Sequence, residues 1–275
     1  MSEFASKVVL ITGAASGFGQ ATANAFAKKG ASLSLVDKDE ENLNKVTEQC
    51  KKAGASKVLA VVVDLRVEDN IVRAMNETIE TFDRLDVLVN NAGITRVGSV
   101  EDAPMESFDL LFHVNVKAHF HFTQLAVPHL EKTKGIVINI TSVAAETLFP
   151  GAIFYGMSKA ALTYLTKSAA LDHFFLRNIC KTLLGLAGKG IRVNAVVPAP
   201  CDTNIMRWPG TLPPGVSADD LINFQAKEQP LGGVNIEKQD VVDAILFLAS
   251  DSARTITGTC LAVDRGRLLV GSKAT

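Results

Sequence analysis

The stretch Val-Val-Leu-Ile-Thr-Gly-Ala-Ala-Ser-Gly-Phe-Gly, residues 8–19, decides the fold of this chain. It begins with a short apolar run rich in β-branched residues, which predicts a buried strand over residues 7–12. Glycines follow, and a helical pattern then extends to about residue 29. Glycine lets the backbone approach a ligand closely, and a helix N-terminus attracts anions. A glycine-rich turn alone can simply connect two secondary-structure elements, but this order of strand, turn and helix indicates a dinucleotide site.

The same alternation continues along the chain. Further strands are predicted over residues 31–37, 58–63, 86–89, 136–141, 191–197 and 259–264. Helical patterns cover residues 39–53, 68–82, 104–130, 155–172, 217–229 and 237–250. The chain shows no internal repeat or linker, so we predict one doubly wound, Rossmann-type α/β domain over residues 1–275. Its parallel sheet should contain about seven strands flanked by helices.

Composition narrows the class of protein. Of 275 residues, 47% are apolar and 21% charged, as in ordinary globular proteins. The net charge of −1 comes without a block of like charge, so we expect no nucleic-acid or membrane partner. No apolar run suits a membrane span, and the start offers no signal peptide. Four cysteines lie scattered without metal or redox spacing, which favours the cytoplasm and no metal site.

The ends of the second and third predicted strands carry acids. Asp37 closes the second strand, where a carboxylate can accept hydrogen bonds from an adenosine ribose. Alternatively, Asp37 caps the helix that follows. Asp64 and Leu65 end the third strand in the same way.

Three asparagines draw attention in the middle of the chain. The sequence Asn-Asn-Ala-Gly at residues 90–93 predicts a turn whose side chains fasten neighbouring loops. Asn115 lies within the long predicted helix, where an asparagine usually faces solvent or bonds locally. If Asn115 faces inward it needs a partner, and a water chain in an active site would be one.

Residues 142–159 carry a second constellation. Tyr155 and Lys159 are four residues apart and share one face of a helix. A nearby ammonium favours the phenolate, and general acid–base groups work best with a pKa near the working pH. Ser142 follows a buried strand at the end where open α/β sheets bind ligands. A tyrosine four residues before a lysine is also common on ordinary amphipathic helices.

Together these motifs resemble the short-chain dehydrogenase/reductase family, in its compact single-domain form, over roughly residues 7–266. The family's Thr-Gly-x-x-x-Gly-x-Gly matches residues 12–19, and its Asn-Asn-Ala-Gly matches residues 90–93. Its catalytic asparagine, serine and Tyr-x-x-x-Lys match Asn115, Ser142, Tyr155 and Lys159. The resemblance implies hydride transfer between a nicotinamide cofactor and a secondary alcohol or ketone.

The resemblance also implies a role for each matching residue. Tyr155 would exchange the proton, Lys159 would lower its pKa and bind the nicotinamide ribose, Ser142 would orient the substrate oxygen, and Asn115 would hold a relay water. Cofactor contacts would come from Gly13, Ser16, Gly17, Phe18, Gly19, Asp37, Asp64, Leu65, Asn91, Ala92, Gly93, Tyr155, Lys159, Pro198 and Thr203. Family members commonly pair through the helices that here carry Asn115 and Tyr155, so we expect a homodimer or homotetramer.

The cofactor preference depends on Asp37. A carboxylate there repels the 2′-phosphate of NADP(H), so we predict NAD(H), with NADP(H) as the open alternative. Lys38 argues against this prediction, since its side chain could turn toward the 2′-phosphate of NADP(H).

Three places depart from the family pattern. Ala199 replaces the glycine after Pro198, and Arg265 replaces a glycine in Val-Asp-Gly-Gly. Residues 173–185 are an insertion, for which we expect a helical extension packed on the body or on a partner; a disordered excursion is the alternative. Residues 204–233 are rich in proline and glycine and are predicted to form a lid over the pocket, or else a plain surface loop.

Two rival functions stay open at this point. Within the family, reduction of 3-oxoacyl thioesters competes with sugar, polyol or steroid chemistry. Outside catalysis, the chain could be a dinucleotide-sensing protein, although such a protein has no chemical need for Ser142, Tyr155 and Lys159 together.

Overall fold

A seven-stranded parallel sheet forms the centre of the molecule, as expected from the sequence. The computed structural model describes residues 3–171, 186–207, 211–212 and 215–270. The strands are β1 (Val8–Thr12), β2 (Ser32–Asp37), β3 (Lys57–Val62), β4 (Val87–Asn90), β5 (Ile136–Ile140), β6 (Arg192–Pro198) and β7 (Cys260–Val263). They lie in the order β3-β2-β1-β4-β5-β6-β7, and every adjacent pair is parallel.

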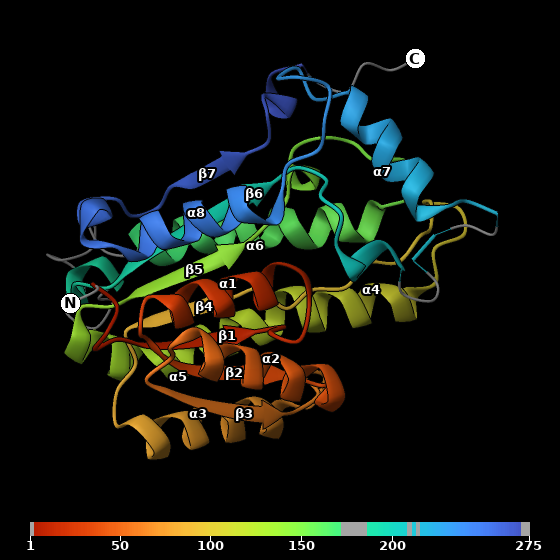
Figure 1. Cartoon of the computed structure of the whole chain (residues 1–275). Coiled ribbons are helices and arrows are strands. Elements are labelled where there is room, and N and C mark those ends of the chain that lie inside the picture. The colour runs from red at the N-terminus through yellow and green to blue at the C-terminus, as the bar shows by residue number, and fades with distance from the viewer. Residues whose placement is uncertain (1–2, 172–185, 208–210, 213–214, 271–275) are drawn as a thin grey trace, which may run out of the picture.

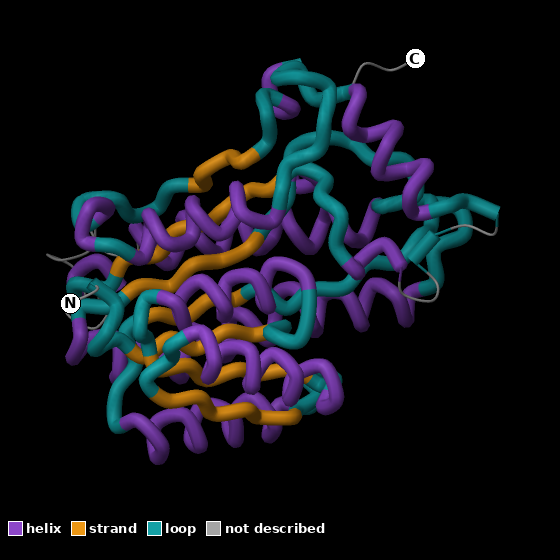
Figure 2. Tube along the Cα trace, in the orientation of Figure 1, coloured by secondary structure: helices purple, strands orange, loops and turns teal. Residues whose placement is uncertain are grey.

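Helices cover both faces of the sheet (Figures 1 and 2). They are α1 (Gly17–Lys28), α2 (Glu40–Ala53), α3 (Glu68–Phe82), α4 (Met105–Phe112), α5 (Ala118–Thr133), α6 (Ile153–Leu171), α7 (Ala218–Lys227) and α8 (Lys238–Ala249). Buried side chains of α1, α2 and α8 join one hydrophobic cluster with the sheet, and those of α3, α5 and α6 join the other. Right-handed crossovers place helices in two such layers.

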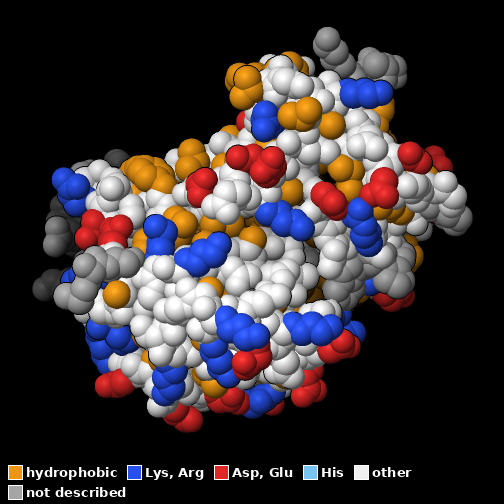
Figure 3. Space-filling model, viewed as in Figure 1, with side chains coloured by type: hydrophobic (Ala, Val, Ile, Leu, Met, Phe, Trp, Pro, Cys, Tyr) orange, Lys and Arg blue, Asp and Glu red, His pale blue; other side chains and the backbone are white. Residues whose placement is uncertain are grey.

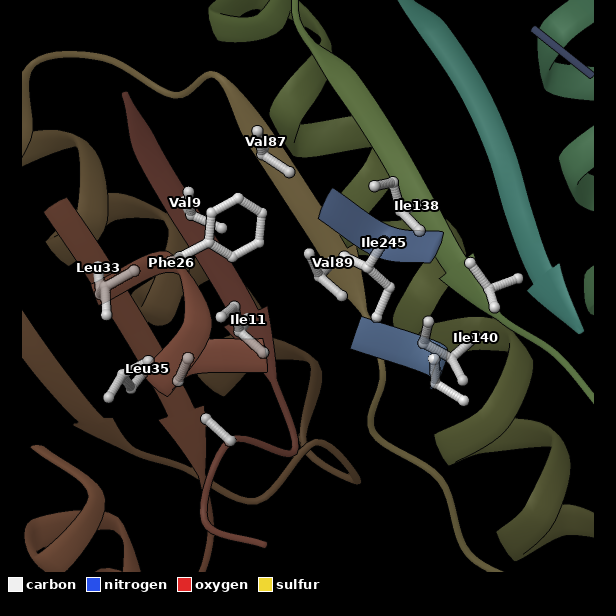
Figure 4. Packing of buried hydrophobic residues seen from close by; sticks show 14 of the residues in the cluster. Val9, Ile11, Phe26, Leu33, Leu35, Val87, Val89, Ile138, Ile140 and Ile245 are labelled. Carbon is white, nitrogen blue, oxygen red and sulfur yellow. The ribbon is translucent and has the colours of Figure 1, made fainter. Parts of the chain in front are cut away.

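The core explains why the strands read as continuous apolar runs. Val9 and Ile11 of β1 pack with Phe26 of α1 and Ile245 of α8 (Figure 4). Their neighbours, such as Leu10, point to the other face and join the second cluster. Strands buried on both faces need apolar residues at every position, in contrast to the alternation of a half-exposed sheet.

On the surface face drawn in Figure 3, basic and acidic side chains are interspersed.

The strand order places a ligand crevice at the carboxyl ends of β1 and β4. The chain builds outward from β1 through β2 to β3, and from β4 in the opposite direction through β5 to β7. Loops on the two sides of this reversal diverge and leave a crevice, which is where doubly wound sheets bind ligands.

The long helix predicted over residues 104–130 is interrupted. A π-helix, η1 (His113–Lys117), separates α4 from α5, and Asn115 lies within it. Short π-helical turns are rare and frequently occur at functional sites. The interruption was not predictable from the local pattern, which stays helical throughout.

The proposed lid is only partly described. Its described residues include a 3-10 turn, η4 (Asn204–Arg207), and α7, which lies beyond the carboxyl ends of the strands (Figure 1). Arg207 forms ion pairs with Asp202 and Asp219, which link the end of η4 to the start of α7. The predicted insertion, residues 173–185, lies outside the described residues. None of the described helices has the length and apolar character that crossing a membrane requires.

Candidate active site

The glycine loop between β1 and α1 is held by steric constraints. Gly13 and Gly17 have positive φ values of 67° and 55°, a region that other residues rarely adopt. A Cβ atom on Gly19 would lie 2.0 Å from the carbonyl oxygen of Gly13. The backbone of the loop therefore folds onto the first turn of α1 more closely than any side chain allows.

The Asn-Asn-Ala-Gly turn is fastened to this loop, as its sequence predicted. The Thr12 hydroxyl accepts hydrogen bonds from the backbone N–H groups of Asn91 and Ala92, both at 3.0 Å. The Asn91 amide donates to the carbonyl oxygens of Thr12 (2.8 Å) and Gly13 (3.1 Å). These bonds hold the ends of β1 and β4 together at the crevice.

Asp37 faces the glycine loop and does not cap the following helix. Its Oδ2 accepts a hydrogen bond from the Ala15 N–H at 2.9 Å, and its Oδ1 accepts from the N–H groups of Lys38 and Asp39. Asp39 is the N-cap of α2 and accepts from the Asn42 N–H. The capping alternative therefore belongs to Asp39, and Asp37 is fixed as a carboxylate at the edge of the crevice.

Ser142, Tyr155 and Lys159 come together at the end of β5. The Lys159 side chain is only 3% exposed. Its ammonium donates to the carbonyl oxygen of Ile140 at 2.8 Å and lies 5.7 Å from the centre of the Tyr155 ring. The Ser142 hydroxyl is a hydrogen-bond partner of Tyr155. A serine, a tyrosine and a lysine thus share one site, as the sequence predicted.

Asn115 is fully buried behind this site and points inward. Its Oδ1 accepts from the Ile94 N–H at 2.9 Å, and its Nδ2 donates to the Ile94 carbonyl (2.9 Å) and to the Ser158 hydroxyl (3.0 Å). The asparagine therefore joins the π-helix to α6 and to the segment after Gly93. These protein groups are the inward partners that the sequence alone left open.

One cavity of about 1030 Å³ connects these parts. Most of the predicted site residues line it: Gly13, Ser16, Gly17, Phe18, Asp37, Asp64, Leu65, Asn91, Ala92, Gly93, Ser142, Tyr155, Lys159, Pro198 and Thr203. Gly19 and Asn115 are absent from this lining. Gly19 instead packs α1 against the loop, and Asn115 supports the wall from behind.

Comparison with known proteins gives the same assignment along most of the chain. The family model described as enoyl-(acyl carrier protein) reductase matches residues 13–267. The chain is 35% identical over 263 residues to 2-(R)-hydroxypropyl-CoM dehydrogenase of Xanthobacter autotrophicus, with 94% of this chain and 97% of that protein covered. The chain belongs to the short-chain dehydrogenase/reductase family. Membership makes it an oxidoreductase that acts on CH–OH groups.

Two further relatives carry related names. The 3-oxoacyl-(acyl-carrier-protein) reductase of Thermotoga maritima is 34% identical over 264 residues, with 96% of this chain and 98% of that protein covered. The crystal structure of 3-ketoacyl-(acyl-carrier-protein) reductase from Brucella melitensis, complexed with NADH, superposes with a TM-score of 0.81. It is 30% identical, and the match covers 95% of this chain and 98% of that chain.

In this short-chain dehydrogenase/reductase, burial controls the acid–base groups. Burial raises the pKa of Tyr155 to about 12, although the hydrogen bond with Ser142 acts in the opposite direction. Burial also lowers the pKa of Lys159 to about 8. The sequence suggested that Lys159 lowers the pKa of Tyr155; in this structure the loss of solvent around the phenol is the larger effect.

The cavity has two parts with different linings. We call the part around the glycine loop, Asp37 and residues 91–93 the cofactor half, and the part beneath η4 and α7 the lid half. The lid half is lined mainly by apolar side chains, with a few polar ones that the sequence did not single out: Arg96, Thr211, Gln225, Glu228 and Arg267. The amphipathic pattern over residues 217–229 was the available signal, but it does not tell which polar residue faces inward.

His119 is a second buried group that the sequence underrated. It is fully buried on α5, and burial, assisted by the positive charge of Lys159, lowers its pKa to about 3. The ring is therefore neutral at physiological pH, and His119 is a residue of the core.

Proposed function

We propose that this chain is an NAD(H)-dependent dehydrogenase/reductase that interconverts a secondary alcohol and a ketone. The observation that carries the proposal is the single cavity, which runs from Asp37 and the glycine loop to Ser142, Tyr155 and Lys159. A dinucleotide bound along the crevice would bring its reactive ring to the acid–base group without any rearrangement of the sheet.

The cofactor half fits a dinucleotide. Ser16 is the N-cap of α1 but makes no side-chain capping hydrogen bond, so the N–H groups of the first turn are free of that competitor for a pyrophosphate. Asp37 would accept hydrogen bonds from the adenosine ribose. Thr203, beside Gly17, and Pro198 would contact the nicotinamide end. When bound, the nicotinamide supplies or receives the hydride.

Side chains of the protein itself would transfer the proton. With its pKa near 12, the Tyr155 phenol keeps its proton at neutral pH and can donate it from Oη to a substrate carbonyl oxygen. The Ser142 hydroxyl, which is hydrogen bonded to Tyr155, would hold the substrate carbonyl oxygen in place. Lys159 would bind the nicotinamide ribose and, when protonated, stabilise the phenolate left after the transfer.

Asn115 has a supporting role in this proposal. Through both atoms of its amide it fixes the backbone of Ile94, and through Ser158 it fixes the helix that presents Tyr155 and Lys159. Such positioning holds the two walls of the site at constant spacing, a requirement for proton transfer over hydrogen-bond distance. The relay water stays a prediction.

The preference for NAD(H) follows from the place of Asp37. Three backbone N–H groups fix this carboxylate, so it could not turn aside for the 2′-phosphate of NADP(H). The cation Arg66 also lines this part of the cavity, but it is engaged with Asp64 at 2.8 Å.

Reduction of 3-oxoacyl thioesters is the second candidate. The names of two relatives, from Thermotoga maritima and Brucella melitensis, favour it. The apolar lining of the lid half would also accept an acyl chain.

The proposal also includes an oligomeric state and a cellular compartment. Exposed apolar side chains on α5 and α6, among them Phe120, Met157 and Tyr164, support pairing through these helices into a homodimer or homotetramer. The described cysteines, Cys50, Cys201 and Cys260, form no disulfide with one another, in keeping with a cytoplasmic enzyme.

The proposal is tested by following hydride transfer over a panel of secondary alcohols, ketones and 3-oxoacyl thioesters. We expect turnover with at least one class and a preference for NAD(H). Binding of NADH without turnover of any member would favour the dinucleotide-sensing alternative instead.

A further inference from the structure

Helix α7 presents one polar side chain to an otherwise apolar wall. The α7 residues that line the lid half are Leu221, Ile222, Phe224 and Gln225. Gln225 is only 6% exposed, although glutamine is normally a surface residue. A polar residue on the inward face of a lid helix needs a physical reason.

One atom of the Gln225 amide lacks a partner in the described part of the chain. Its Oε1 is buried and has no hydrogen-bond partner among the described residues. A buried polar group without a partner destabilises the folded state, and most such groups in proteins are paired. Since the side chain lines the cavity, a ligand can supply the partner. Rotation of the terminal amide exchanges Oε1 and Nε2, so the ligand can meet an acceptor or a donor.

Each of the neighbouring amides Gln229 and Asn235 has at least one hydrogen-bond partner, whereas the Gln225 side chain has none among the described residues. Gln229 donates from Nε2 to the Asn235 oxygen, and Asn235 donates to the Ile222 carbonyl, both at 2.9 Å. Thr211 repeats the pattern of Gln225 independently. It also lines the cavity, is 2% exposed, and its hydroxyl has no partner among the described residues. Two residues of the cavity lining thus carry a buried polar atom without a partner among the described residues.

The charges nearby indicate a neutral ligand group. Glu228 and Arg267 also line the lid half, but they bond to each other at 2.8 Å. Their charges balance. Arg96, the other charged residue of the lid half, donates to the Thr95 carbonyl at 2.8 Å and has no acidic partner among the described residues. The match to a neutral group therefore rests on Gln225 and Thr211, neither of which is ionisable. A hydroxyl or an amide, which donates and accepts like the glutamine amide itself, is the matching chemistry.

We propose that Gln225 is a specificity residue that hydrogen bonds a second neutral polar group of the substrate, a hydroxyl or an amide. This inference rests on the proposed function and adds the substrate class: molecules with an apolar body and one hydrogen-bonding group besides the reacting oxygen. Thr211, which lines the same cavity, would offer a second hydrogen-bonding group.

The test compares matched substrate pairs with the variant Gln225→Leu. One pair is a vicinal cyclohexanediol and cyclohexanol; the other is the acetoacetyl thioester of N-acetylcysteamine and that of a plain alkanethiol. The first pair tests a hydroxyl and the second an amide. We expect the parent to prefer one polar member, and Gln225→Leu to lower kcat/KM for that member about tenfold or more. The member without the second group should change little.

Gln229→Leu is the control. Gln229 is as deeply buried and its Oε1 also has no partner among the described residues, but it does not line the cavity, so its loss should leave the preference unchanged. The melting temperature separates a structural role from a specificity role: Gln225→Leu should keep or raise it, since an unpaired buried amide is removed.

Equal changes of kcat/KM for both members of each pair, or an unchanged preference, would overturn the inference. Calorimetric binding of the same compounds to the protein saturated with NADH keeps the two proposals apart. If the parent binds the polar member more tightly, Gln225→Leu abolishes that preference and yet no compound is turned over, the proposed function fails while the specificity role of Gln225 stands.

Discussion

The cofactor half and the lid half of the cavity are held together in different ways. In the cofactor half, Thr12, Asn91 and Asp37 bind backbone groups of neighbouring loops, and Gly13 and Gly19 leave no room for a side chain. In the lid half, Thr211 and Gln225 have side-chain oxygens without partners among the described residues, and a Cβ on the lid residue Gly215 would meet no atom within 4 Å. From this difference we expect the cofactor half to be complete in the free protein and the lid half to be completed by the proposed substrate.

The largest effect is expected at Tyr155, where the two halves meet. Tyr155→Phe removes the proton-exchanging hydroxyl but keeps the ring, so kcat should fall by about 10²–10⁴-fold while NADH still binds. Tyr164→Phe is the control, because that tyrosine lies on the same helix and is 75% exposed. Steady-state kinetics and NADH titration measure both. A Tyr155→Phe enzyme with a rate near that of the parent would show that another group exchanges the proton.

A glycine substitution in each half tests the difference in packing. Gly19→Ala places a Cβ against the Gly13 carbonyl and should destabilise the protein by about 3 kcal/mol, with loss of cofactor binding. In Gly215→Ala in the lid, the added Cβ meets no atom within 4 Å, and the only cost is an alanine at positive φ. We therefore expect the free energy of unfolding to fall by about 1 kcal/mol. Urea unfolding measures both changes. Equal losses would contradict the contrast between the halves.

Removal of one charge tests the cofactor preference. Asp37→Asn keeps the shape of the side chain but ends the repulsion of a 2′-phosphate, so the ratio of kcat/KM values for NADP(H) over NAD(H) should rise about tenfold or more. Asp39→Asn, two residues away and outside the cavity lining, should leave this ratio unchanged. A parent that already prefers NADP(H), or an unchanged ratio in Asp37→Asn, would remove Asp37 from the explanation.

The smallest effect is a change of stability with pH. Because burial lowers the pKa of Lys159 from 10.5 to about 8, the unfolded chain holds a proton between these values that the folded chain has released. This residue therefore makes the free energy of unfolding rise with pH between about 8 and 10.5. Above pH 10, Tyr155 acts in the opposite direction, because burial raises its pKa from 10 to about 12.

Lys159→Met should remove the rise, so that unfolding free energies of parent and variant diverge as the pH increases from 8 to 10. The exposed Lys167 on the same helix provides the control variant, Lys167→Met. If parent and Lys159→Met showed parallel pH profiles, the ammonium would not be buried in the way the structure indicates.

The contrast between the halves also explains what the sequence could predict. The strands, the glycine loop, Asp37 and the pair Tyr155 and Lys159 follow from local rules of periodicity, steric freedom and helix spacing. Such rules act within a few residues, so one sequence is enough to find them. Ser142, after a buried strand, and Asn115, within a long helix, were candidates from their places in the pattern, and the family resemblance added their roles.

The remaining features depend on contacts between distant segments. The π-helix at Asn115 coincides with hydrogen bonds to Ile94, which lies in another loop. The inward direction of Gln225 depends on how α7 lies over the cavity, and the raised pKa of Tyr155 depends on burial by several elements. A local sequence pattern contains no information on these contacts between distant segments.

Isotope transfer tests the central claim, hydride transfer by this chain, most directly. The protein is incubated with NAD⁺ and a secondary alcohol that it accepts, deuterated at the carbinol carbon, and the reduced cofactor is weighed by mass spectrometry. We predict reduced cofactor that carries the deuterium, formed by the parent and almost absent with Tyr155→Phe. Cofactor that is reduced without deuterium, or that stays oxidised with every alcohol tested although it binds, would contradict the account.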